Sequence, residues 1–204
     1  MIPDSADARQ RASQIISAGG LIAFRTDTFY GLGVEPFNQA ALERLKALKG
    51  REANKPILVI ISDEEQAARF IAHRSRAFEA VAARHWPGAL TIVALARPEV
   101  PAELTAGSGT IGVRLPDDED VRALVRACGG ALTATSANPA GAAPARSALE
   151  VANYFPDSLD LIVDGGEAVT DKPSTVLDLS TDTPRLIREG VIAREQLAEI
   201  FHQP

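Results

Sequence analysis

Two short segments, far apart in the sequence, combine the residue types that bind a small anion. Residues 133–138, Thr-Ala-Thr-Ser-Ala-Asn, place hydroxyl and amide groups directly after an apolar run, as a strand does where it ends at the mouth of a pocket. Lys49, Arg51 and Lys55 concentrate positive charge within seven residues. Neutral hydrogen-bonding groups and concentrated positive charge together predict a site for a small, highly anionic substrate.

Both segments also have an ordinary structural interpretation. The basic residues follow a helical pattern, and cations at the C-terminal end of a helix complement its dipole. Ser136 and Asn138 precede Pro139, and Asn-Pro sequences favour turns. Spacing alone therefore leaves the alternatives open: helix-end and turn chemistry, or binding of a triphosphate and its nucleotide.

Other polar residues stand where expected strands end. Arg114 closes an apolar strand and needs an anionic partner, either a structural carboxylate or a substrate. Residues 25–33 follow the first strand, and their glycines would let the backbone approach a ligand, although neither the G-x-G-x-x-G nor the Walker A spacing is present. Asp27, Asp164 and Asp171 could bind Mg²⁺ through water, but nothing in their spacing requires it.

The elements that must position these residues follow from hydrophobic periodicity and from capping and turn residues. Helices are expected at 5–18, 39–49, 64–71, 76–85, 117–128, 146–154 and 194–201. Strands are expected at 21–24, 56–61, 90–95, 111–115, 131–135, 161–163, 175–179 and 185–187. Helices and strands alternate through most of the length, which predicts an α/β fold with some antiparallel pairing near the end. We expect a single domain over residues 1–204, because no linker-like stretch divides them.

Composition narrows the class of protein. Apolar residues make up 46% of the chain, enough for a sizeable core. The net charge of −6 argues against a generally basic nucleic-acid-binding surface, although a local basic cavity stays open. The single cysteine, the polar N-terminus without a signal peptide and the absence of a long apolar run predict a cytoplasmic protein without a membrane span. The three histidines lack zinc-ligand spacing, so no metal ligands are predicted.

Taken together, eight short motifs resemble the YrdC/Sua5/TsaC family of threonylcarbamoyl-AMP synthases. In order they are Thr26-Asp-Thr-Phe-Tyr-Gly-Leu-Gly33, Lys49-Gly-Arg51, Trp86-Pro-Gly88, Val113-Arg-Leu-Pro116, Thr135-Ser-Ala-Asn138, Asp164-Gly-Gly166, Ser174-Thr-Val176 and Arg188-Glu-Gly190. Each motif alone is weak, but eight in the family's order over residues 20–190 are specific. The length is similar to that of the short, single-domain TsaC/YrdC type.

The resemblance implies a YrdC/RibB-like fold, with a twisted mixed sheet, flanking helices and a large basic cavity. It implies an enzyme, a nucleotidyltransferase that makes L-threonylcarbamoyladenylate and pyrophosphate from L-threonine, bicarbonate and ATP, with Mg²⁺. The product serves t6A modification of tRNAs that read ANN codons. As partners it leaves open a hand-off to a t6A transferase complex and weak binding of tRNA or double-stranded RNA, without membrane attachment.

The resemblance also implies roles for individual residues. The catalytic set would be Lys49, Arg51, Ser136 and Asn138, which also bind ATP together with Lys55, Thr110 and Arg188. The threonine or carbamate would be held by Thr28, Arg114, Ala134 and Ser174. One departure concerns threonine binding, because Ile60 stands where some members have a histidine.

Two alternatives remain beside the synthase. One is a HypF-like domain that handles a carbamoyl adenylate within the same fold. The other is a non-catalytic module that binds tRNA or double-stranded RNA through the basic cavity, and the acidity of the chain weighs against it.

Overall fold

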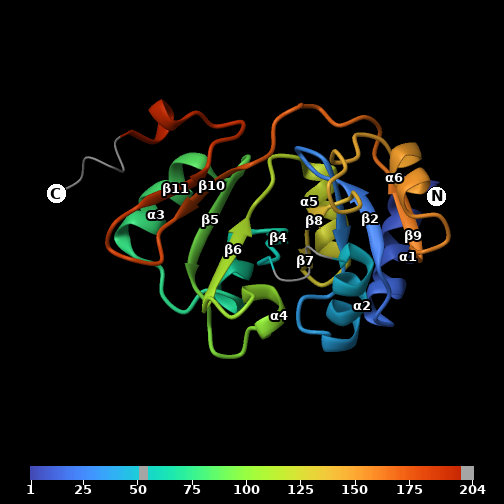
Figure 1. The fold of residues 1–204 in the computed structure, drawn as a ribbon, viewed down its shortest axis with the longest axis horizontal. Coiled ribbons are helices and arrows are strands. Elements are labelled where there is room, and N and C mark those ends of the chain that lie inside the picture. Colours follow the sequence, from blue (N-terminus) through green and yellow to red (C-terminus); the bar gives the residue numbers. More distant parts are fainter. Residues whose placement is uncertain (51–54, 199–204) are drawn as a thin grey trace.

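The strands of the protein form two mixed sheets. The computed structural model describes residues 1–50 and 55–198. In chain order the strands are β1 (Ile2–Pro3), β2 (Ile22–Arg25), β3 (Tyr30–Gly33), β4 (Val59–Ile61), β5 (Leu90–Leu95), β6 (Thr110–Arg114), β7 (Ala131–Thr133), β8 (Thr135–Ser136), β9 (Leu161–Asp164), β10 (Thr175–Asp178) and β11 (Arg185–Arg188). The first sheet has the order β1-β9-β2-β3-β8 and the second the order β11-β10-β5-β6-β4-β7, and Figure 1 shows them next to each other.

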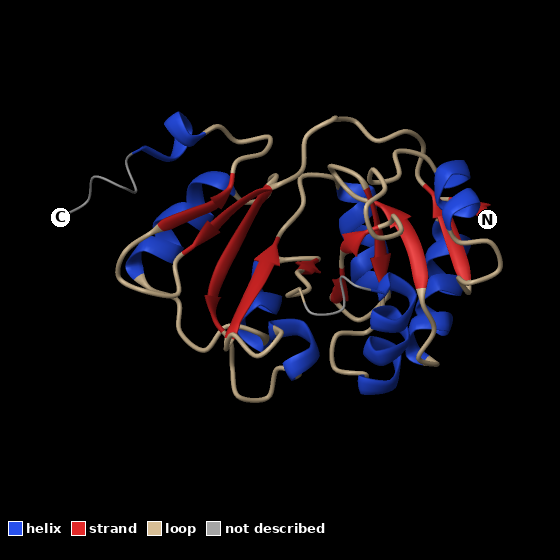
Figure 2. Cartoon of the chain, viewed as in Figure 1, coloured by secondary structure: helices blue, strands red, loops and turns tan. Residues whose placement is uncertain are grey.

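Helices flank both sheets (Figure 2). They are α1 (Ala6–Ser17), α2 (Gln39–Lys49), α3 (Arg76–His85), α4 (Ala102–Thr105), α5 (Glu119–Ala127) and α6 (Ala148–Tyr154), with 3₁₀ helices at Glu64–Arg69 and Arg194–Leu197. Helices α1 and α6 contact the first sheet, while α3 and α5 contact the second. In the described part of the chain, no helix combines the length and apolar character needed to cross a bilayer.

Local sequence explains why the helices begin and end where they do. In α1, the Ser5 hydroxyl accepts a hydrogen bond from the Ala8 amide at 3.1 Å, which caps the first turn. The buried residues Ala8, Ala12 and Ile16 then recur every fourth position along one face. The helix ends before Gly19, whose φ of +79° is a left-handed conformation that favours glycine.

The two sheets meet where the chain passes from β7 to β8. Strand β7 pairs with β4 in the second sheet, and β8 pairs with β3 in the first. Between them, the Ala134 amide donates to the Leu58 carbonyl at 2.9 Å, outside either ladder. The single strand expected at 131–135 is therefore two short strands, and this crossing brings residues 133–138 between the sheets.

Two groups of buried residues form the core. The larger joins α2, α3 and α6 to the central strands of both sheets. The smaller lies between α1, α5 and strands that include Phe24, Ile60 and Leu132.

The α/β class with flanking helices is confirmed, whereas the expectation of one sheet is corrected to two. Strand β3 was not predicted, since Gly31 and Gly33 made its segment look like a loop. The expected strand at 56–61 begins only at Val59, because proline and its neighbours do not join the ladder. The helix expected at 64–71 is a 3₁₀ helix, and α5 is capped by Asp118 rather than by Asp117. Of the helix expected at 194–201, residues 199–201 lie outside the described residues.

Candidate functional site

A cavity of about 670 Å³ is bordered by residues of both sheets. Its volume falls within the roughly 300–1,000 Å³ of typical small-molecule sites. Its cationic lining residues are Lys46, Lys49, Lys55, Arg114, Arg185 and Arg188, and Asp178 is the only carboxylate among the described residues that line it. Because Asp178 already accepts a bond from Arg185 at 3.0 Å, the remaining positive charge is suited to a ligand with several negative charges.

One wall of the cavity carries the turn between β2 and β3. Thr28 is buried on this turn, and its hydroxyl lies 3.1 Å from that of Thr26. Arg114, at the end of β6, donates to the Thr28 hydroxyl at 3.2 Å. Thr26 in turn donates to the Phe29 carbonyl at 2.7 Å, which fixes the turn. A hydroxyl and a guanidinium are therefore held side by side at the cavity wall, as the binding of a carboxylate or carbamate requires.

Arg114 has a buried anionic partner, Asp27. The Arg114 Nη2 atom lies 3.2 Å from Asp27 Oδ1, and the two side chains are 3% and 7% exposed. Burial raises the pKa of Asp27, while the charge of Arg114 opposes this shift. The sequence left two partners open for Arg114, a structural carboxylate or a substrate. The structure shows the carboxylate, and it leaves Arg114 lining the cavity as well.

A second hydroxyl and guanidinium pair is formed by Ser174, directly before β10, and Arg188, at the end of β11. Arg188 donates to the Ser174 carbonyl through Nε and Nη2 at 3.1 and 3.0 Å, and Nη2 lies 3.2 Å from the Ser174 hydroxyl. The Ser174 hydroxyl also lies 3.1 Å from that of Thr91 on β5. Burial, with a smaller contribution from the charge of Arg114, lowers the pKa of Arg188. An anion in the cavity would relieve this repulsion between the two arginines.

Lys49 fixes the turn that contains Ser136 and Asn138. Its ammonium donates to the carbonyl oxygens of Ser136 and Asn138, both at 2.8 Å, and lies 3.3 Å from Asn138 Oδ1. Ser136 donates to the same Oδ1 at 2.5 Å, and the Asn138 amide donates to the Ala142 carbonyl at 2.7 Å. The helix-end cation and the distant turn form one unit, in which the lysine is 4% exposed.

The remaining predicted site residues border the cavity more loosely. Lys55 is exposed at its edge, and the Thr110 hydroxyl lies 2.9 Å from that of Ser108. Ala134 lines the cavity, but its amide hydrogen is already donated to Leu58. Arg51 lies outside the described residues. Of the other predicted site residues, all but Asn138 line one cavity, and Asn138 is bonded to two of the lining residues, Lys49 and Ser136.

Sequence reasoning missed two polar residues of this site. Asp27 was considered as part of the polar segment 25–33 and as a water-mediated Mg²⁺ ligand, but not as the partner of Arg114, although a carboxylate between two threonines after a buried strand was a signal that it faces a buried cation. Thr91 gave no signal, since a threonine within an apolar strand is usual. Ile60, which stands where some relatives have histidine, is fully buried in the smaller core and is absent from the cavity lining.

The described residues do not provide a cage for a metal ion. Among residues 1–50 and 55–198, no three His, Cys, Asp or Glu side chains cluster as metal ligands. Mg²⁺ is commonly held by one or two carboxylates together with substrate phosphates. Asp178, the carboxylate of the described lining, is committed to Arg185 and to the Ser180 hydroxyl at 2.6 Å. The described side chains thus fit an anion better than a bare cation.

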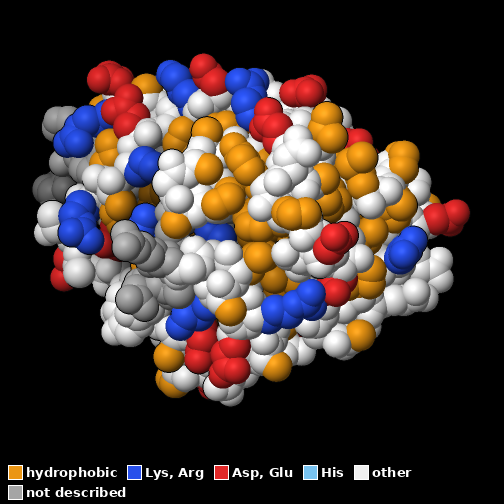
Figure 3. Space-filling model, turned by 45° about the vertical axis from the view of Figure 1, so that its right-hand side comes forward, with side chains coloured by type: hydrophobic (Ala, Val, Ile, Leu, Met, Phe, Trp, Pro, Cys, Tyr) orange, Lys and Arg blue, Asp and Glu red, His pale blue; other side chains and the backbone are white. Residues whose placement is uncertain are grey.

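The face of the molecule in Figure 3 differs from the cavity lining in its charge. Acidic and basic side chains are interspersed over the face shown in Figure 3, around an apolar area. With a net charge of −6 for the chain, this mixture contrasts with the cavity lining, where cations dominate. Positive charge is thus concentrated inside the cavity, where it can select a small anion.

Comparisons with known proteins agree with this geometry. The family model Sua5_yciO_yrdC, described as "Telomere recombination", matches residues 14–190. The threonylcarbamoyl-AMP synthase of Thiobacillus denitrificans is 39% identical over 181 residues, which cover 87% of this chain and 96% of that protein. That of Marinobacter nauticus is 37% identical over 171 residues, covering 83% and 90%.

A solved structure shares the fold. Sua5 of Pyrococcus abyssi, complexed with L-threonine, superposes with a TM-score of 0.94 at 32% sequence identity. The match covers 99% of this chain and 61% of the Pyrococcus protein, so that protein has a large region without a counterpart here. The threonine in that complex belongs to that protein.

Proposed function

Since the chain belongs to the Sua5/YciO/YrdC family, we propose that it is an L-threonylcarbamoyladenylate synthase. It converts L-threonine, bicarbonate and ATP into L-threonylcarbamoyladenylate, pyrophosphate and water. The observation that carries the proposal is the presence of two pairs of a buried hydroxyl and a guanidinium, Thr28 with Arg114 and Ser174 with Arg188, in one cation-rich cavity. The product supplies t6A modification of tRNAs that read ANN codons.

The chemistry needs positioning and charge more than a nucleophilic side chain. The threonine amine combines with CO₂ from bicarbonate to give a carbamate. A carbamate oxygen then attacks the α-phosphorus of ATP, and the bond to pyrophosphate breaks. Negative charge develops on the phosphoryl oxygens and on the leaving group, so fixed cations lower the barrier.

We assign the amino acid end of the reaction to the two hydroxyl and guanidinium pairs. Thr28 and Ser174 hold threonine, and both hydroxyls are buried at the cavity wall. Arg114 meets the carbamate and the α-phosphate, because its guanidinium already lies against Thr28. Ala134 shapes this end of the cavity through its backbone, although its amide hydrogen is engaged.

We assign the ATP end to the basic residues and to the turn after β8. Arg188, Lys55 and Arg51 bind phosphates, and Ser136 and Asn138 bind the nucleotide, with Thr110 contributing from β6. Lys49 supports this end in two ways: its charge attracts phosphates, and its hydrogen bonds shape the Ser136–Asn138 turn. Mg²⁺ arrives with the triphosphate, since the described residues provide no cage for it.

The proposal extends to the surroundings of the reaction. Residues 1–204 act as one YrdC-like domain in the cytoplasm. The unstable adenylate passes to a t6A transferase complex, and tRNA binds at most weakly. The mixed charge on the face in Figure 3 supports weak rather than strong binding of tRNA, because strong non-specific RNA binding depends on many exposed cations.

Pyrophosphate release tests the function. Purified protein is incubated with ATP, Mg²⁺ and bicarbonate, with and without L-threonine. We expect release that depends on both threonine and bicarbonate. Release without threonine would contradict the synthase and favour another adenylate-forming reaction, and tight, salt-dependent RNA binding without release would favour the RNA-binding module.

A further inference from the structure

Asp27 is a buried carboxylate whose bonding is incomplete. It lies on the turn between β2 and β3, and its side chain is 7% exposed. Neither carboxylate oxygen accepts a hydrogen bond of ordinary geometry from the described residues, although the backbone amides of Asp27 and Asp117 oppose the rise of its pKa, and the Arg114 Nε atom is equally without a partner there. Burying a carboxylate in this state costs free energy, so such a group calls for a specific explanation.

Arg114 lies between Asp27 and the cavity. Arg114 lines the cavity, whereas Asp27 is not among the described lining residues. The Arg114 Nη2 atom lies 3.2 Å from Asp27 Oδ1. Its Nη1 atom donates to the hydroxyl of Thr28, a lining residue, at 3.2 Å. The ion pair with Arg114 therefore links the Asp27 carboxylate to a side chain that lines the cavity.

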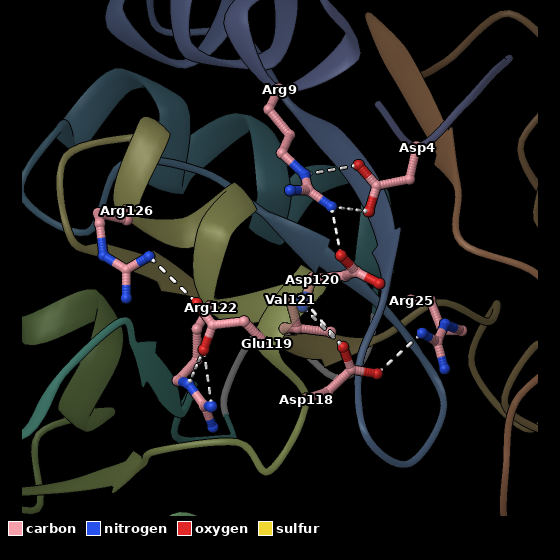
Figure 4. Close-up of polar contacts among 9 residues, drawn as sticks. All are labelled: Asp4, Arg9, Arg25, Asp118, Glu119, Asp120, Val121, Arg122 and Arg126. Atoms are coloured by element: carbon pink, nitrogen blue, oxygen red, sulfur yellow. Dashed lines mark hydrogen bonds and ion pairs between the residues drawn. The ribbon is translucent and has the colours of Figure 1, made fainter. Parts of the chain in front are cut away.

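The turn that carries Asp27 is held from both ends. On its inner side, the Thr28 amide donates to Thr26 Oγ1 at 3.1 Å. On its outer side, Arg25 forms an ion pair with Asp118 at 2.8 Å, as Figure 4 shows. Asp118 also accepts from the Val121 amide at 3.2 Å and so caps α5. The carboxylate is thus fixed relative to a helix end instead of following the side chain it contacts.

We propose that Asp27 is a positioning residue, which holds the Arg114 guanidinium in the orientation that meets the anionic carbamate and α-phosphate. This inference rests on the proposed function. Without the carboxylate, Arg114 is free to turn toward other acceptors, and the reacting groups lose an alignment on which the rate depends. The charge of Asp27 also compensates the buried cation until a substrate supplies its own negative charge.

Asp27→Asn is the direct test, because asparagine keeps the shape of the side chain and removes its charge. We expect kcat to fall roughly 10- to 100-fold, as small misplacements of reacting groups do, with an essentially unchanged KM for ATP. The matched control is Arg9→Gln, which breaks a partly exposed pair with Asp4 and Asp120 away from the turn (Figure 4). It is expected to keep the wild-type kcat. Wild-type kcat in Asp27→Asn, or an equal loss in Arg9→Gln, would overturn the inference.

A double-mutant cycle separates positioning from a general structural role. Arg114→Gln removes the group through which Asp27 acts. Adding Asp27→Asn to it is then expected to leave kcat unchanged. Losses that multiply instead would mean that Asp27 acts independently of Arg114, and the inference would be wrong. If Asp27→Asn does not fold, Asp27→Glu replaces it, because the extra methylene moves the charge, and an undiminished kcat would count against positioning.

A crystal structure of Asp27→Asn gives a readout independent of turnover. We expect the Arg114 guanidinium to leave the Thr28 hydroxyl. A guanidinium that stays within hydrogen-bonding distance of Thr28 would overturn the inference even if the wild-type protein proved inactive. Conversely, a wild-type protein without threonine-dependent turnover would contradict the proposed function alone, so the two failures are distinguishable.

Discussion

Two buried cations of the same cavity are held in opposite ways. Lys49, 4% exposed, donates to three acceptors on the Ser136–Asn138 turn, enough to use all three ammonium hydrogens. Arg114, 3% exposed, has one ion pair and one hydroxyl partner, and its Nε atom has no acceptor among the described residues.

This difference indicates that Lys49 mainly shapes the cavity, whereas Arg114 is available to bind the substrate. The Lys49 end of the cavity is shaped by the chain itself, because the Lys49 ammonium donates its hydrogen bonds to two backbone carbonyls and to the Asn138 side chain. The Arg114 end keeps spare hydrogen-bonding capacity, which an anionic substrate can use. On this account, mutations at the Lys49 end change the shape of the ATP site, and mutations at the Arg114 end change the chemical step.

The largest effect is expected at the Arg114 end. Arg114→Ala removes a charged donor from the reaction and leaves Asp27 buried without its cation. We expect kcat/KM to fall by roughly 10²- to 10³-fold, and the free energy of unfolding to fall by about 3–5 kcal/mol. Pyrophosphate release and urea denaturation measure the two effects. If Arg114→Ala were as stable as the wild type and kept its turnover, the proposed difference between the Arg114 and Lys49 ends of the cavity would be wrong.

Lys49→Ala is expected to come next. We expect turnover to fall roughly 10²-fold with a raised KM for ATP. The unfolding free energy should fall by about 2–3 kcal/mol, since backbone carbonyls lose a charged donor. Lys46→Ala, on the same helix but only half-buried, is the matched variant for stability, and we expect little change in its unfolding. Equal destabilisation by both variants would show that Lys49 does not hold the turn.

Ser136→Ala tests the Lys49 end of the cavity further, and a smaller effect is expected. The variant loses one neutral donor to Asn138 Oδ1 but leaves the bonds from Lys49 in place. We expect a loss of about 1 kcal/mol in transition-state stabilisation, close to fivefold in kcat/KM. A loss as large as that of Lys49→Ala would mean that the serine itself contacts the reacting phosphate.

The smallest expected effect is a pH dependence at the Arg114 end. Burial raises the pKa of Asp27 above its usual 3.8, against the opposing charge of Arg114 and with a small addition from Asp118. The native state therefore binds this proton more tightly than the unfolded state. The contribution of Asp27 to stability is then greatest at low pH and declines as the pH rises from about 3.8 through the raised value. Urea denaturation of wild type and Asp27→Asn across this range should show that the free energy of unfolding of the wild type falls relative to that of the variant as the pH rises. A rise of the wild-type value relative to the variant would contradict the assignment.

The sequence was most informative where local signals are strong. Helix α2 lies at its expected bounds because Asn38 caps it and Gly50 ends it, and β5 does so because its residues are apolar apart from Thr91. Apart from Asn138, the predicted site residues in the described part of the chain line one cavity, and motif order rather than spacing was the guide to them.

The parts that could not be predicted depend on distant contacts. Strand β3 is a strand only because β2 and β8 pair with it, and its glycines hid this. The break at Ala134 requires the carbonyl of Leu58, far away in the sequence. The pairing of Asp27 with Arg114, and the capture of the Asn138 turn by Lys49, likewise appear only once the two sheets are assembled.

The most direct test of the account is detection of its product. Wild-type protein is incubated with ATP, Mg²⁺, L-threonine and ¹³C-bicarbonate, and the mixture is analysed at once by mass spectrometry. The account predicts threonylcarbamoyladenylate that carries one ¹³C atom, and no such species when threonine is omitted. Consumption of ATP with no labelled adenylate would contradict it.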